Sequence, residues 1–321
     1  GSGVVSITAC SSNPIRLGGT DATSGAWINL VEAEADRITT SAGMVFTADT
    51  ISVRAVATTK VEGDSIELNA RASGGTITFS GSASFESLNA TAAHGIVIST
   101  NSVTIATTEG ALALDADYDS SGGGVTDITG TGVTLSSFTN LLLHHRQSGH
   151  VRVDMPARWE ANDDVTLSVG ALLEGTGSLT LIADTNGGGE ASGTFTCDAT
   201  GNLTVVPSTV DTLSLSGGNM ALAAGCEILA SASHVHIEPS TDLGMSLGVD
   251  TASTFSLTDT ELDQITTTGT LQFGVTKGAA TLVNGVTRNA GTETELRILT
   301  TGDLTFSTVA SSFASTTYMT S

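Results

Sequence analysis

Hydrophobic and polar residues alternate along most of the chain in short runs. Each run spans three to five residues and carries Val, Ile, Leu or Phe at every second position. Such alternation gives one buried and one exposed face, which is typical of β-strands. Clear cases are residues 66–68, 76–79, 96–98, 103–105, 112–114, 165–167, 179–181, 203–205, 213–215 and 304–306. The pattern predicts an all-β protein, with helical character only at residues 30–37 and 261–264.

The shortness of these runs favours stacked coils over a β-sandwich. A sandwich core normally uses large aromatic anchors, whereas aromatic residues are only 4% of this chain. Stacked coils align equivalent positions of successive turns, which suits short strands rich in Val, Ile, Leu and Thr. We therefore predict an elongated β-solenoid of roughly fourteen coils, at about 22 residues per coil.

The chain also repeats itself over a long distance. Residues 28–46 (INLVEAEADRITTSAGMVF) align without a gap with residues 255–273 (FSLTDTELDQITTTGTLQF). The offset is 227, because Glu34 meets Glu261, and it also matches residues 76–80 with 303–307. A second motif recurs at residues 112–124 and 179–189. We predict one continuous solenoid over residues 1–321, with about 1.4 copies of a 227-residue super-repeat.

Two segments resemble the filamentous-haemagglutinin type of secreted β-helix repeat protein. They are residues 261–265 followed by 269–273, and residues 164–168 followed by 177–181. The resemblance implies a right-handed parallel β-helix, secretion, and a fibrous or adhesive role. The amino-terminal secretion domain of that family is not recognisable here.

The charge balance excludes one class of partner. The chain has 33 acidic and 11 basic residues, a formal net charge of −22. Binding to a nucleic-acid backbone needs a basic surface, so no nucleic-acid partner is expected. No apolar run approaches the roughly 20 residues of a membrane span, and no signal peptide opens the chain. We expect an extracellular or cell-surface location without membrane insertion. The acidity suits surroundings rich in calcium or salt, with solubility alone as the alternative.

Calcium is the candidate cofactor. Alternating carboxylates precede a glycine loop at Asp115, Asp117 and Asp119, an arrangement that can wrap a hard cation with oxygen ligands. The second copy of this motif carries Asp184 and Glu190. The alternative is a solvated turn in each copy. The His234, His236 and Glu238 row has a spacing that a transition metal can use, with an exposed polar ladder as the alternative.

One stretch differs in composition from the rest of the chain and is a candidate assembly contact. Arg and Trp are enriched at contact hot spots, and an acidic chain needs a basic patch to dock on itself. The alternative is an irregular loop bulging from one coil. The residues are His144, His145, Arg146, His150, Arg152, Arg158 and Trp159.

The cysteines and two sequons complete the candidate sites. Cys197 and Cys226 lie about one coil apart, so stacking could join them in a disulfide; two buried thiols are the alternative. Asn89 and Asn202 begin glycosylation sequons, which matter only for a secreted chain in a eukaryotic host.

No nucleophile, zinc-protease or phosphate-loop motif is present, and an enzyme is not expected. The sequence predicts a structural segment or subunit of a fibre, surface filament or adhesin stalk. Its partners would be copies of itself and, in addition, cell-surface or matrix glycans. The alternatives are a stand-alone carbohydrate-binding adhesin and a polysaccharide-active β-helix enzyme.

Overall fold

Parallel strands, placed side by side in successive turns of the chain, make up the computed structural model of this protein. The structure describes residues 3–10, 13–20, 27–35, 37–38, 40, 42–56, 65–120, 124–144, 150–168, 170–186, 193–198, 202–205, 210–230, 234–251, 255–274, 280–288, 292–307, 309–313 and 315–320. It divides into two units, Gly1–Asp154 and Met155–Ser321. The prediction of an all-β protein built from stacked parallel strands is confirmed.

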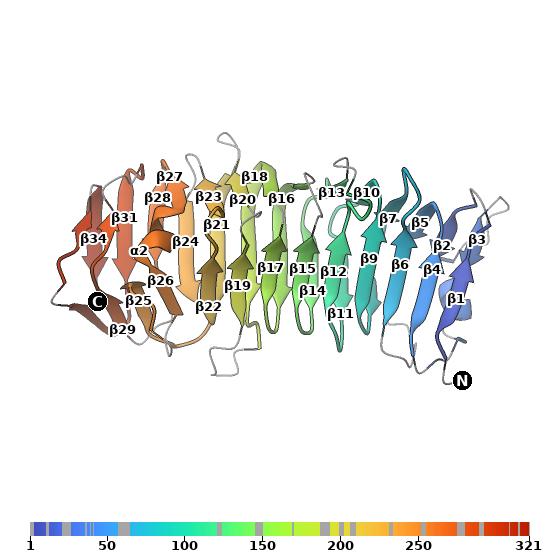
Figure 1. Cartoon of the computed structure of the whole chain (residues 1–321), viewed down its shortest axis with the longest axis horizontal. Helices are drawn as coiled ribbons and strands as arrows, with labels where there is room; N and C mark the ends of the chain where they lie inside the picture. Colours follow the sequence, from blue (N-terminus) through green and yellow to red (C-terminus); the bar gives the residue numbers. More distant parts are fainter. Residues whose placement is uncertain are drawn as a thin grey trace. The chain divides into compact units, whose positions relative to one another are not determined.

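Unit 1 contains three stacks of parallel strands, which the chain visits in turn. The first stack is β1 (Val5–Thr8), β4 (Met44–Thr47), β6 (Ile66–Ala70), β9 (Leu88–Ala92), β12 (Leu112–Asp115) and β15 (Leu141–His144); Figure 1 shows its strands side by side. The second is β3 (Ile28–Leu30), β2 (Ile15–Leu17), β5 (Thr50–Val53), β7 (Thr76–Phe79), β10 (Gly95–Ile98), β13 (Val125–Ile128) and the start of β16 (His150–Ala161). The third is β8 (Ala83–Phe85), β11 (Thr104–Thr107) and β14 (Val133–Ser137).

In unit 1, the register of the paired strands places aliphatic residues of successive coils next to one another. Ile66 lies beside Leu88, and Leu88 lies beside Leu112, so one buried ladder runs through three successive coils. In the second stack, Ile77 and Ile96 form the corresponding pair. Burying such an aliphatic side chain contributes about 1.5–3 kcal/mol, so the aligned ladders are the main source of stability.

Unit 2 repeats this architecture. We call its longest described series of parallel pairings the long stack: the second half of β18 (Gly170–Ala183), β21 (Val210–Gly217), β24 (His234–Pro239), β28 (Thr270–Phe273), β31 (Glu295–Leu299) and β34 (Thr316–Thr320). A second stack contains the first half of β18, β20 (Asn202–Val205), β23 (Glu227–Ala230) and β27 (Ile265–Thr267). A third contains β17 (Val165–Ser168), β19 (Thr194–Cys197) and β22 (Asn219–Leu222).

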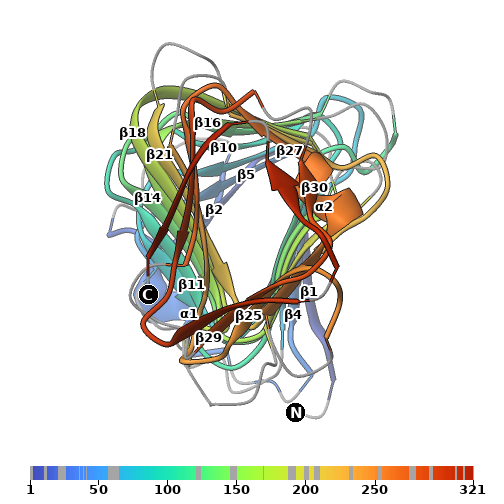
Figure 2. The same cartoon turned by 90° about the vertical axis from the view of Figure 1, so that its left-hand side faces the viewer.

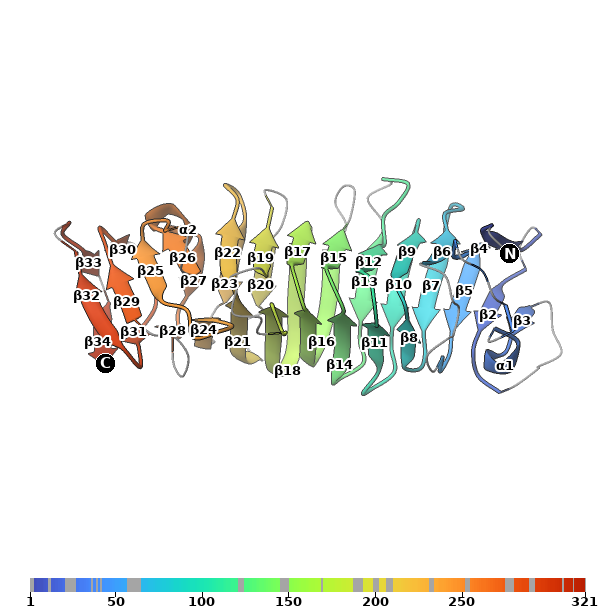
Figure 3. The ribbon, with the colours of Figure 1, turned by 90° about the horizontal axis from the view of Figure 1, so that it is seen from below.

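A further sheet of unit 2 has the order β26 (Phe255–Thr258), β25 (Met245–Gly248), β29 (Ala280–Val283) and β32 (Asp303–Phe306), and the last three are adjacent in Figure 3. The short strands β30 (Thr287–Arg288) and β33 (Ser312–Phe313) pair with each other. In Figure 2, α2 (Asp259–Asp263) and β30 lie together at one corner of this unit.

Two short helices interrupt the strands: one lies within the predicted helical segment 30–37, and the other overlaps the predicted segment 261–264 but begins two residues earlier. They are α1 (Glu32–Ala35) and α2, and the 227-residue offset aligns them with each other. Thr258 caps α2, because its side chain accepts from the Glu261 N–H while the Glu261 carboxylate accepts from the Thr258 N–H. The two copies diverge after the helix: residues 265–267 form β27, whereas Ile38 and Thr40 lie outside strands. The super-repeat itself stays a prediction. Among the described residues, no helix has the length and apolar character required to cross a membrane.

Candidate functional site

A polar hollow lies over the long stack of unit 2 and has a volume of about 270 Å³. Outward-facing residues of successive strands form its floor in matched rows. Ile182 lies beside Ser216 and Ser216 beside Glu238, while Thr180 lies beside Ser214. The lining residues are Arg158, Thr180, Ile182, Asp184, Thr185, Ser214, Leu215, Ser216, Glu238 and Ser240.

Asp184 is the buried acid of this hollow, with 1% of its surface exposed. It follows the end of β18 in a left-handed conformation (φ 70°), which Asp tolerates better than most residues. Its N–H donates to the Asp163 carbonyl at 3.0 Å. Gly193 packs directly against it, and a Cβ on Gly193 would lie 2.5 Å from the Asp184 Cβ. Asp184 is therefore held between the Asp163 carbonyl, which accepts its N–H, and Gly193, which packs against its Cβ.

Ser240 reaches Asp184 across the intervening coil. The Ser240 hydroxyl donates to Asp184 Oδ2 at 2.8 Å, although 56 residues separate the two in sequence. The residues of the coil between them at this level are Gly217 and Gly218, and Gly217 lies beside Pro239 in the register. Because glycine has no side chain, it leaves the space in which the carboxylate and the hydroxyl meet.

Two carboxylate oxygens of the hollow are buried without a hydrogen bond from the described residues: Asp184 Oδ1 and Glu238 Oε2. Glu238 Oε2 lies 3.6 Å from His236 Nε2 on the same outward face of β24. Burial lowers the pKa of His236, and the nearby Glu238 charge and a hydrogen bond with the Gly274 backbone only partly oppose this. His236 is therefore mostly neutral at pH 7, and it does not balance the Glu238 charge.

The carboxylates predicted to bind calcium in unit 1 do not gather into a cluster. Asp115 and Asp117 are buried, whereas Asp119 is exposed, and the Asp117 N–H donates to Asp115 Oδ1 at 3.2 Å. Among the described residues, no group of three or more His, Cys, Asp or Glu side chains could hold a metal ion. The described part of the run therefore supplies no ready-made site. Glu190 lies outside the described residues, while Asp184 is the buried acid of the hollow.

The predicted assembly contact is wrong for Trp159, which is fully buried with 0% exposure. The signal was available in the sequence: Ala157, Trp159 and Ala161 alternate with polar residues and all point inward. Arg158 is exposed and pairs with Glu160 at 2.6 Å, while Arg152 lies 3.8 Å from Asp127. Both arginines thus face nearby carboxylates. His144 and His150 are half-buried, and His145 and Arg146 lie outside the described residues.

The remaining predicted positions take ordinary places in the fold. Cys197 and Cys226 form a disulfide, with an S–S distance of 2.02 Å. Asn89 is exposed on the outward face of β9, and the Asn202 side chain lies outside what the structure describes. Their glycosylation stays a prediction.

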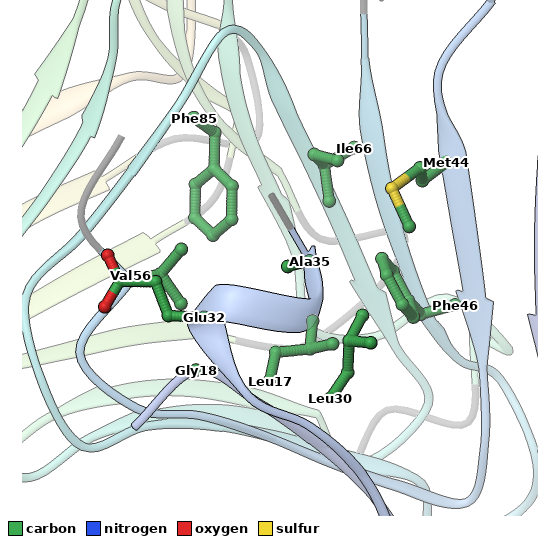
Figure 4. Close-up of a pocket in the computed structure, with 10 residues that line it drawn as sticks. All are labelled: Leu17, Gly18, Leu30, Glu32, Ala35, Met44, Phe46, Val56, Ile66 and Phe85. Atoms are coloured by element: carbon green, nitrogen blue, oxygen red, sulfur yellow. The ribbon is translucent and has the colours of Figure 1, made fainter. Parts of the chain in front are cut away.

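An apolar pocket under α1 in unit 1 offers no comparable chemistry. Its volume is about 20 Å³, and Figure 4 shows Ala35 of α1 above Leu17 and Leu30, with Met44 and Phe46 beside it. This space holds no more than a water molecule and has few polar partners for one. We interpret it as a packing gap beneath a helix that covers the core.

Sequence analysis did not identify the hydroxyls of the hollow. Ser214, Ser216 and Ser240 are unremarkable in a chain this rich in serine, and the pairing of Asp184 with Ser240 depends on the lengths of two coils. Comparisons with protein-family models, with curated proteins and with solved structures find no significant match to this chain. The site must therefore be interpreted from its own geometry.

Proposed function

We propose that the chain is a structural segment or subunit of an extracellular fibre, surface filament or adhesin stalk. In this proposal, both units belong to one right-handed parallel β-helix that covers residues 1–321. Coils stack along the axis and lateral contacts join neighbouring fibres. Its partners are copies of itself and, at the surface, cell-surface or matrix glycans.

The observation that carries the proposal is that buried aliphatic residues of successive strands lie beside one another. In the long stack, Leu213 lies beside Val235, Val235 beside Leu271, and Leu271 beside Leu296, all buried. The same strands form backbone hydrogen bonds with both neighbours, so a load along the stack is shared by every coil. Such an interior serves mechanical continuity rather than a catalytic cleft.

The strand edges of unit 2 offer a surface for further coils. Among the described residues, β34 pairs with β31 on one side only, and β32 likewise pairs with β29. Phe306, Val309 and Tyr318 are about half exposed in this region. In the proposed stacking, a further coil, of this chain or of another, would pair with these edges.

Electron microscopy of the protein from its native source tests the proposal. We expect filaments with an axial repeat of about 50 Å or a simple multiple, because one super-repeat of roughly ten coils advances about 4.8 Å per coil. Well-separated short particles at every concentration tested would contradict assembly by stacking.

A further inference from the structure

Asp184 presents a buried charge that the protein satisfies only in part. Its Oδ2 accepts the Ser240 hydroxyl at 2.8 Å, but its Oδ1 is buried and accepts no hydrogen bond from the described residues. A buried carboxylate is costly unless every oxygen is hydrogen-bonded or neutralised. The side chain lines the hollow, and an ion held there would supply the missing partner.

The walls of the hollow supply oxygen atoms of the kind that a hard cation prefers. Ser216 and Glu238 lie side by side across β21 and β24, and Glu238 Oε2 is also buried without a hydrogen bond from the described residues. Together with Asp184, which directly follows β18, and Ser240, which directly follows β24, they provide two carboxylates and two hydroxyls from three neighbouring coils. Calcium takes six to eight oxygen ligands in flexible geometry and accepts water among them.

The charges around the hollow favour a cation over a neutral ligand. Arg158 is the basic residue of the lining, and its guanidinium already pairs with Glu160 at 2.6 Å. The volume of about 270 Å³ lies below the roughly 300–1,000 Å³ of typical small-molecule pockets. At about 30 Å³ per water, it has room for an ion with part of its hydration shell.

We propose that this hollow binds one calcium ion, with Asp184 as the principal ligand and Glu238 as the second carboxylate. The ion joins the end of β18 to β24 across the intervening β21, and so ties three coils together. The site is contained in unit 2 and does not depend on the fibre proposal.

Isothermal titration of the whole chain, first stripped with chelator, with calcium chloride tests this site. Asp184→Asn keeps the shape of the side chain and removes its charge. We expect this variant to bind one calcium ion fewer than the wild type, or to bind it at least about tenfold more weakly, because affinity follows ligand charge. Asp242→Asn is the matched control, since Asp242 is exposed two residues beyond Ser240 and is not part of the lining. It should bind calcium as the wild type does.

Circular dichroism establishes whether each variant is folded. If Asp184→Asn is unfolded, Glu238→Gln tests the calcium site in its place. The Glu238 side chain is 23% exposed, so this variant should fold, and it too should weaken calcium binding. Calcium should also raise the Tm of the wild type and of Asp242→Asn, and it should raise that of Asp184→Asn by less. A wild-type chain that binds no calcium would overturn the proposal. So would folded Asp184→Asn or Glu238→Gln proteins that bind calcium with wild-type stoichiometry and affinity.

Discussion

Arg288 is buried, with 3% of its surface exposed, and it connects α2 to the following coil of unit 2. Its Nε donates to Glu293 Oε1 at 2.9 Å and its Nη2 to Glu293 Oε2 at 3.1 Å. The guanidinium also donates to the carbonyl of Leu262, in the last turn of α2, and to that of Ile265, the first residue of β27. A cation at this end of a helix complements the helix dipole and satisfies carbonyl groups that have no partner within the helix.

Glu293→Gln should destabilise unit 2 by about 3–5 kcal/mol, because it leaves a buried guanidinium without its counter-charge. Urea unfolding followed by circular dichroism measures the change. Glu295→Gln is the control: it removes a similar pair with Arg297, whose side chain is 45% exposed, and should have little effect. Equal losses of unfolding free energy in Glu293→Gln and Glu295→Gln would contradict this role of Arg288.

The same pair predicts a pH dependence. Burial by itself would raise the pKa of Glu293, but the hydrogen bonds and charge of Arg288 outweigh it and hold the pKa below 4.5. The unfolded chain therefore binds more protons than the folded chain in acid. The stabilisation is fully present above pH 4.5 and is lost as the pH falls through the folded pKa. The difference in free energy of unfolding between the wild type and Glu293→Gln should therefore become smaller as the pH is lowered from neutral to acid.

Trp159 should stabilise the fold through the volume of its side chain and not through its indole N–H group. The indole nitrogen is buried and has no hydrogen-bond partner among the described residues. Trp159→Ala should cost about 3–5 kcal/mol through the cavity it leaves. Trp159→Phe should cost less than half as much, because it also removes an unsatisfied donor. Thermal unfolding measures the loss of stability in both variants. Equal losses in Trp159→Ala and Trp159→Phe would contradict a role that depends on volume alone.

At the level of elements, the disulfide joins two successive coils of unit 2. Cys197 ends β19, Cys226 directly precedes β23, and both are buried. The bridge closes a loop with a sequence separation of 29 residues. Replacing both cysteines with alanine should cost about 3–4 kcal/mol, since the unfolded chain regains the entropy of that loop. Cys10, an exposed free thiol, provides the control variant Cys10→Ser, which should unfold as the wild type does.

Local pattern was sufficient to predict most strands and both helices. Alternation depends only on neighbouring residues, so runs such as residues 96–98 and 112–114 gave strands directly, at β10 and β12. The lengths of β16 and β18 were not predicted: the pattern marked only residues 179–181 of β18 and no part of β16. In β18, one uninterrupted segment serves two stacks. The order of β25 and β26 was not predictable either, since β26 occupies the edge position before β25 in their sheet.

The candidate site lay beyond sequence reasoning for a different physical reason. Which residues meet across coils depends on coil length, and coil length varies: Ile66 pairs with Leu88, whereas Leu112 pairs with Leu141. An error of one residue would move Asp184 to the opposite face of its strand. The Asp184–Ser240 contact spans two such coils, so it required the structure.

At the scale of the whole molecule, the proposal is that coil stacking continues from each chain to the next. The acidic surface keeps such a fibre soluble, and the aligned aliphatic ladders give it cohesion. Lateral association of separate chains would also produce filaments, but the strands would then have no fixed relation to the filament axis.

X-ray diffraction from oriented filaments of the native protein distinguishes these two arrangements most directly. Stacked coils place the spacing between strands along the axis, so we predict a reflection at about 4.8 Å on the meridian. A reflection at this spacing on the equator, or none at all from well-oriented filaments, would contradict assembly by stacked coils.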